Sequence, residues 1–167
     1  MKKENILPGV VLTLVCAIVC GLLAVVNALT YDKIAEAEAN KVQKSLVAVF
    51  GEGTYTETGA SFEGVTAVYS SSSGLTIYDI TADGYSKGGI RALIGIDTDG
   101  AVAGVGIVSC GETAGVGTKI TAADYLAQFT GAKEQSGYPD IISRATFSSN
   151  GLRKAVDLAL QCEKEGQ

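Results

Sequence analysis

The sequence has no histidine, no tryptophan and only two prolines among its 167 residues. The absence of histidine excludes an imidazole base, an imidazole proton shuttle and any metal site with histidine ligands. The four cysteines lack the CxxC spacing of a zinc ribbon or a ferredoxin-type cluster, so no metal site is expected. The chain is acidic, with 18 Asp and Glu against 13 Lys and Arg, and has no long basic run. Nucleic acid is therefore not an expected partner.

Charge is also missing from one long stretch, residues 6–30. At about 1.5 Å per residue, a helix of this length is more than long enough to cross a bilayer core of roughly 30 Å. We therefore expect a cytoplasmic stub and a single transmembrane helix within residues 1–30, in contact with membrane lipid. A cleaved signal peptide is the alternative, because Lys2 and Lys3 could form its basic region, but the apolar run is long for a signal core.

The remaining 137 residues are acidic, with a net charge of −6, and contain 19 of the 21 glycines. This length is enough for one ordinary domain. Residues 31–50 predict a stalk helix that continues from the membrane, and residues 51–167 predict the domain itself. The apolar residues of the stalk fall roughly on one helical face, and they are Ile34, Val42, Leu46, Val49 and Phe50.

Within the domain, β-branched residues and tyrosine precede two helical patterns. Strands are predicted over residues 64–69, 75–82, 90–97 and 101–109. A helix over residues 121–129 has Thr121 as its expected N-cap. A second helix over residues 149–163 has a serine cap and an apolar face of Leu152, Val156, Ala159 and Leu160. Strands first and helices last indicate an α+β fold, an antiparallel sheet flanked by helices.

A glycine-rich segment, residues 111–119 (GETAGVGTK), leads from the last predicted strand toward a helix. Three glycines at this spacing leave backbone N–H groups free to face an anion or a planar ring. A simple turn between two elements is the alternative interpretation. The segment matches neither the Walker phosphate loop nor the dinucleotide fingerprint, so those modes of nucleotide binding are disfavoured.

A second segment, residues 140–149 (DIISRATFSS), lies just before the last predicted helix. Hydroxyl side chains at a helix N-terminus ordinarily cap it, and that interpretation suits Ser148 and Ser149. Thr146 lies upstream of the expected first turn and is not explained as a cap. A helix N-terminus beside Arg144 would also suit a phosphate.

These two segments, in this order and about 30 residues apart, resemble the FMN-binding domain of the G subunit of the Rnf electron-transport complex. A related protein is the C subunit of the sodium-pumping NADH:quinone reductase. The resemblance extends over residues 42–160, includes residues 84–90 (GYSKGGI) and agrees with a single N-terminal helix.

The resemblance implies a covalent cofactor. In that family a flavin transferase, with FAD as donor, joins FMN through its phosphate to a threonine hydroxyl. Carried over, Thr146 is the attachment point, and Asp140, Ser143 and Ala145 complete the recognition sequence. The other residues expected to bind the cofactor are Glu112, Thr113, Gly115, Val116, Gly117, Lys119, Ser148 and Ser149.

Three residues depart from the family pattern. Arg144 replaces a glycine, and it either hinders the modification or pairs with the phosphate. Ala114 stands where proline is common, and Cys110 where histidine is common. Cys110 and Cys162 either form a disulfide or remain free thiols. Lys119 is either a cofactor contact or a solvated residue.

The resemblance implies an electron-relay subunit of a membrane-bound, ion-translocating ferredoxin:NAD oxidoreductase, with no independent substrate site. Its partners would be the other Rnf subunits, both integral-membrane and iron–sulfur or flavin proteins, together with the flavin transferase. The FMN domain would lie on the extracytoplasmic side of the cell membrane. A pilin-like surface assembly protein and a free-standing membrane-anchored flavoprotein reductase are the alternatives.

Overall fold

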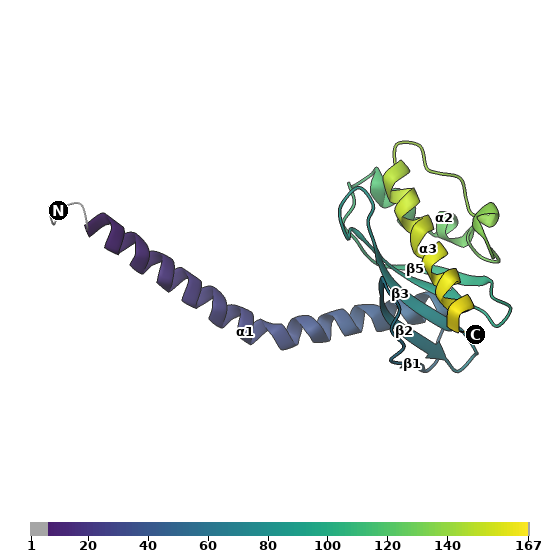
Figure 1. Cartoon of the computed structure of the whole chain (residues 1–167), viewed down its shortest axis with the longest axis horizontal. Coiled ribbons are helices and arrows are strands. Elements are labelled where there is room, and N and C mark those ends of the chain that lie inside the picture. The colour runs from purple at the N-terminus through teal and green to yellow at the C-terminus, as the bar shows by residue number, and fades with distance from the viewer. Residues whose placement is uncertain (1–6, 167) are drawn as a thin grey trace. The chain divides into compact units, whose positions relative to one another are not determined.

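The computed structural model describes residues 7–166 and has the expected α+β architecture (Figure 1). The chain divides into two compact units, the first ending at Lys41 and the second beginning at Val42. The elements in chain order are α1 (Leu7–Phe50), β1 (Tyr55–Glu57), β2 (Val65–Ser71), β3 (Thr76–Ala82), β4 (Ile90–Ile96), β5 (Val102–Cys110), the 3-10 helix η2 (Gly117–Thr121), α2 (Ala123–Ala127), the 3-10 helix η3 (Gln135–Gly137) and α3 (Thr146–Gly166). Residues 1–6 of the predicted stub lie outside the described residues.

Helix α1 is unbroken over 44 residues, and its segment Pro8–Tyr31 is long and apolar enough to cross a membrane. The side chains of this segment are exposed, as suits contact with lipid. The hydroxyls of Thr13 and Thr30 donate to carbonyl oxygens one turn earlier, at 2.9 Å each. Their polar groups are thus satisfied inside the helix, which a bilayer requires.

The five strands form one antiparallel sheet in the order β1-β2-β3-β4-β5. The four strands predicted from sequence are confirmed, with ends that differ by at most two residues. The sequence did not predict β1, because it has only three residues and lies at the sheet edge with little burial.

Each face of the sheet packs against a helix. Ile80 and Ile94 lie on one face in a buried cluster with α3, whose predicted apolar residues Leu152, Val156, Ala159 and Leu160 are all buried. On the other face, Ile77 and Leu93 contact the last turns of α1 through Val42 and Leu46. Of the predicted stalk face, Ile34 is exposed and takes no part in this packing.

The end of α1 is set by a glycine. Gly51 has φ +86°, a conformation that terminates helices, and its N–H donates to the carbonyl of Val47 at 3.0 Å. The last turn then lies directly on Gly95, Gly104 and Gly106, where an added Cβ would meet the side chains of Phe50 and Val49. Glycines in β4 and β5 therefore provide the flat surface that receives the helix end.

For the helix predicted over residues 121–129, the predicted first residue is wrong, because α2 begins at Ala123. The chain forms η2 up to Thr121, turns at Ala122 with an extended ψ of 130°, and only then forms α2. The Thr121 hydroxyl donates to the carbonyl of Thr118 at 2.8 Å, so it closes the preceding turn instead of capping α2.

Replacing Gly95 by alanine should lower the free energy of unfolding by about 1–3 kcal/mol. The new carbon would lie 2.9 Å from Cζ of Phe50 and closer still to Cε1. Gly53→Ala is the matched control, because its nearest neighbours would be 3.9 Å away. Denaturant unfolding of the full chain in detergent, followed by circular dichroism, compares the two. Equal stability of both variants would contradict the packing described.

Candidate functional site

Three segments distant in sequence meet at one small pocket of about 140 Å³. The first lies between β3 and β4, the second is the glycine-rich loop after β5, and the third is the start of α3. The predicted residues Thr113, Val116, Gly117, Ala145 and Ser148 all line the pocket. The other lining residues are Tyr85, Arg144 and Phe147.

Glu112 lies behind the wall of this pocket and is buried. Its carboxylate accepts hydrogen bonds from the backbone N–H groups of Tyr85 and Ser86, at 2.9 and 3.1 Å, and from the hydroxyl of Ser148. Burial alone would raise the pKa of Glu112, but the hydrogen bonds from Ser148, Tyr85 and Ser86 outweigh it and lower the pKa. Glu112, which was predicted to contact the cofactor, is thus an ionised side chain whose hydrogen bonds connect all three segments.

Three glycines make room for this carboxylate. An added Cβ at Gly84 would lie 2.8 Å from the carboxyl carbon of Glu112, and one at Gly89 would collide with its oxygen. At Gly117 the added carbon would be 2.7 Å from both Cβ of Glu112 and Oγ of Ser148. Part of the glycine excess in the sequence therefore serves this one side chain.

The glycine-rich loop is closed by its own hydrogen bonds. The carbonyl of Thr113 accepts from the N–H groups of Val116, Gly117 and Thr118, at 2.9–3.2 Å. The Thr118 hydroxyl accepts from the N–H of Gly115, which has φ +72°. Val116 is left partly exposed at the pocket. Gly115 shapes the loop and does not line the pocket.

Helix α3 begins at Thr146, three residues before the predicted start, because the carbonyl of Ala145 already accepts the N–H of Ser149 at 2.8 Å. The expectation that a serine caps this helix is therefore wrong. Ser148 and Ser149 are buried within the first turn. Ser148 donates to Glu112, whereas the Ser149 hydroxyl accepts from the N–H of Ile142 at 3.2 Å, away from the pocket.

Thr146 is the first residue of α3, and its side chain is exposed. Within residues 7–166 its hydroxyl makes no hydrogen bond, and the N–H groups of Thr146, Phe147 and Ser148 have no backbone acceptor. Free amides at the positive end of a 21-residue helix favour an anion such as a phosphate. The residues on either side of Thr146 line the pocket.

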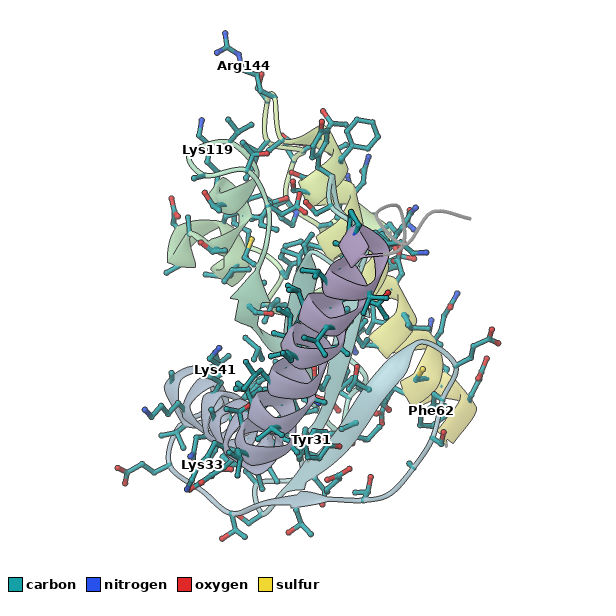
Figure 2. The ribbon with its side chains drawn as sticks, turned by 90° about the vertical axis from the view of Figure 1, so that its left-hand side faces the viewer. Tyr31, Lys33, Lys41, Phe62, Lys119 and Arg144 are labelled. Atoms are coloured by element: carbon teal, nitrogen blue, oxygen red, sulfur yellow. The ribbon has the colours of Figure 1, made fainter. Side chains whose placement is uncertain are left out.

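Arg144 has φ +69°, the left-handed conformation that glycine adopts without strain. The glycine that the resemblance leads us to expect at this position would adopt this conformation without strain. The Arg144 side chain extends away from the domain, as does Lys119 (Figure 2). Neither forms an ion pair with any residue that the structure describes.

Two aromatic residues at the pocket were not singled out from the sequence. The rings of Tyr85 and Phe147 meet edge to face, with centroids 6.4 Å apart. Their exposed fractions are 74% and 69%, large values for apolar rings. The available signals were the position of Tyr85 in the GYSKGGI segment and that of Phe147 directly after Thr146.

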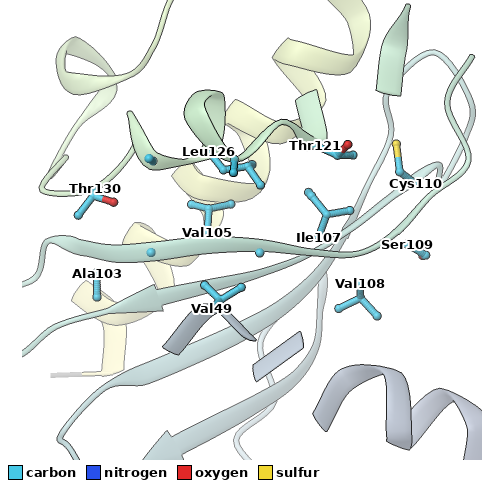
Figure 3. A pocket seen from close by; sticks show the side chains of 14 residues that line it. Val49, Ala103, Val105, Ile107, Val108, Ser109, Cys110, Thr121, Leu126 and Thr130 are labelled. Carbon is cyan, nitrogen blue, oxygen red and sulfur yellow. The ribbon is translucent and has the colours of Figure 1, made fainter. Parts of the chain in front are cut away.

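A larger groove of about 610 Å³ runs along the edge strand β5, beside α2 and the last turn of α1 (Figure 3). Cys110 is at this groove, but none of the residues expected to bind the cofactor lines it. Cys110 and Cys162 are free thiols. Because the sequence motifs converge on the smaller pocket, that pocket is the candidate site.

The comparisons with known proteins agree with this geometry. The family model of an FMN-binding domain matches residues 84–161, which contain all the residues that line the pocket. A model of the RnfG N-terminal region matches residues 1–49. The fold and the site therefore define a membrane protein with an FMN-binding domain after its apolar helix.

Two similar proteins identify the family, and both are named as the G subunit of an ion-translocating oxidoreductase complex. The protein from Shewanella piezotolerans is 29% identical over 95% of this chain and 89% of its own length. The protein from Vibrio vulnificus is 30% identical over 89% of this chain and 84% of its own length. The chain belongs to the RnfG family.

Glu112→Gln should lower the free energy of unfolding by about 1–3 kcal/mol at neutral pH, because an amide cannot accept all three hydrogen bonds. The folded-state pKa of Glu112 is below its ordinary 4.5, so the stabilisation is complete above pH 4.5 and is lost as the pH falls through the lowered value. The difference between the two proteins should shrink accordingly in denaturant titrations at several pH values. A difference that persists unchanged at low pH would contradict an ionised Glu112.

Arg144→Gly should raise the free energy of unfolding by about 1 kcal/mol, because it relieves a left-handed conformation at a residue with a Cβ. Arg144→Ala keeps the Cβ and serves as the control for loss of the charge. Thermal unfolding of the full chain in detergent checks both. A gain in stability that alanine reproduces would show that charge, and not backbone strain, is responsible.

Proposed function

We propose that this chain holds FMN as a phosphoester on Thr146 and relays electrons within a membrane-bound complex. As a member of the RnfG family with an FMN-binding domain, it is an FMN-carrying subunit of an ion-translocating oxidoreductase complex. The observation that supports the attachment point is the exposed Thr146 hydroxyl, without a hydrogen-bond partner in residues 7–166, beside the pocket.

The surroundings of Thr146 suit a phosphoester. The free first-turn amides and the helix dipole stabilise negative charge on the phosphate. In the attachment step, the Thr146 oxygen bonds to the flavin-side phosphorus of FAD while the pyrophosphate bond breaks, AMP leaves and the hydroxyl proton is released. Asp140 and Ser143 are exposed upstream of Thr146, so a flavin transferase can reach the recognition sequence.

The pocket is suited to electron relay. Its volume of about 140 Å³ is well below the roughly 300–1,000 Å³ of pockets that enclose a ligand. A flavin attached here would lie largely at the surface, against Tyr85, Val116 and Phe147. Among the described residues, Arg144 is the only charged one lining the pocket, so the pocket wall offers no acid–base pair to turn over a substrate. The bound flavin supplies the redox chemistry, and the protein positions it for the next carrier.

The wider setting follows from the family. We propose that the other subunits of the complex are the electron partners, between ferredoxin and NAD, and that the FMN domain lies on the extracytoplasmic side. The FMN-binding domain argues against a pilin-like assembly protein. The match of the RnfG N-terminal region argues against a free-standing reductase, because the relatives that share this region are named as parts of a complex.

Thr146→Ala should abolish covalent flavin, because alanine has no oxygen to form the phosphoester. The full chain, co-expressed with a flavin transferase and denatured in a gel, should show flavin fluorescence under ultraviolet light only with Thr146 intact. Thr121→Ala is the control, since this residue is outside both motifs and should keep the fluorescent band. Covalent flavin in Thr146→Ala would refute the assignment, and no flavin on the unmutated chain would refute the covalent proposal.

A further inference from the structure

Among residues 7–166, the carboxylate of Glu112 has no cationic partner. No lysine or arginine of this range forms an ion pair with it, and its three donors are two backbone N–H groups and one hydroxyl. Such donors stabilise a carboxylate without cancelling its net charge. A full negative charge therefore remains inside the domain.

This charge is separated from the pocket by one layer of atoms. Gly117 and Ser148 line the pocket on one side and contact Glu112 on the other. An added Cβ at Gly117 would be 3.2 Å from a carboxylate oxygen of Glu112. Glu112, Gly117 and Ser148 are all buried, so the charge lies below the protein surface and close to the pocket.

Three glycines leave room for the carboxylate in this position. Gly84, Gly89 and Gly117 surround it so closely that a side chain at any of them would displace it. The carboxylate also accepts from the backbone N–H groups of Tyr85 and Ser86, and so it holds the backbone that carries the Tyr85 ring. Glu112 therefore both positions Tyr85, which lines the pocket, and places a negative charge next to the pocket.

From this geometry, and on the basis of the proposed function, we propose that Glu112 is a positioning residue that lowers the reduction potential of the bound FMN. Electron uptake adds negative charge to the flavin, and a buried carboxylate next to the site opposes that addition. A flavin at such a site is a stronger reductant than the same flavin without the carboxylate.

The test compares midpoint potentials of covalently loaded full-length protein in detergent, measured by spectroelectrochemical titration at neutral pH. Glu112→Gln should shift the potential to a more positive value. Asp99→Asn removes the same charge from the exposed β4–β5 turn, at the opposite end of these strands, and should leave the potential unchanged. An equal shift in both variants, or none in Glu112→Gln, would overturn the proposal.

The variant Ser148→Ala distinguishes an effect of the Glu112 charge from an effect of loosening the glycine-rich loop. It removes one hydrogen bond to Glu112 but keeps the carboxylate, so the potential should stay the same or become more negative. If the loop were merely loosened, Ser148→Ala and Glu112→Gln would shift the potential in the same direction, which would refute the role of the charge. The shift between Glu112→Gln and the unmutated protein should also vanish as the pH falls below the pKa of Glu112.

Amide hydrogen exchange of the flavin-free chain gives an independent readout. The N–H groups of Tyr85 and Ser86 should be protected in the unmutated chain and exchange faster in Glu112→Gln. Equal exchange in both would contradict the positioning role.

If the unmutated chain takes up no covalent flavin at all, the proposed function fails. Normal flavin loading of Glu112→Gln with an unchanged reduction potential rejects only the inference about Glu112.

Discussion

The site depends on one buried carboxylate. Glu112 holds the loop between β3 and β4, the glycine-rich loop and the start of α3 together through three hydrogen bonds. The glycines around it allow these backbones to approach, and Ser148, which is buried in the first turn of α3, donates its hydroxyl to the carboxylate. Thr146, two residues earlier, is then left at the surface with its side chain exposed. The proposed attachment point thus lies two residues from the serine that contacts the carboxylate.

Much of the fold could be predicted from the sequence. Segments rich in β-branched residues and tyrosine located four strands, because these residues suit a pleated sheet. Helical periodicity identified the buried face of α3, because burial on one side imposes this pattern. The three-residue strand β1 carries too few residues to show a pattern. The start of α2 was wrong because Thr121 closes a 3-10 turn, a local choice that residue type alone does not reveal.

The site was predicted in part. The two motifs do converge on one pocket, but the sequence could not show that Glu112 points inward, since a carboxylate in a glycine-rich loop is normally solvated. Ser148 and Ser149 were interpreted as caps because hydroxyls are common at helix starts. Their actual partners, Glu112 and Ile142, are residues that only the folded chain brings near them. Tyr85 and Phe147 were missed although they stand inside or beside the quoted motifs, because an aromatic residue in such a segment is more often buried than exposed at a pocket.

Peptide mapping by tandem mass spectrometry tests the central claim most directly. The full chain, co-expressed with a flavin transferase, is digested, and the peptide that contains the start of α3 is fragmented. We expect one FMN, joined through its phosphate with loss of one water, on Thr146. Flavin located on Ser143, Ser148 or Thr113, or on no residue of the chain, would contradict this claim.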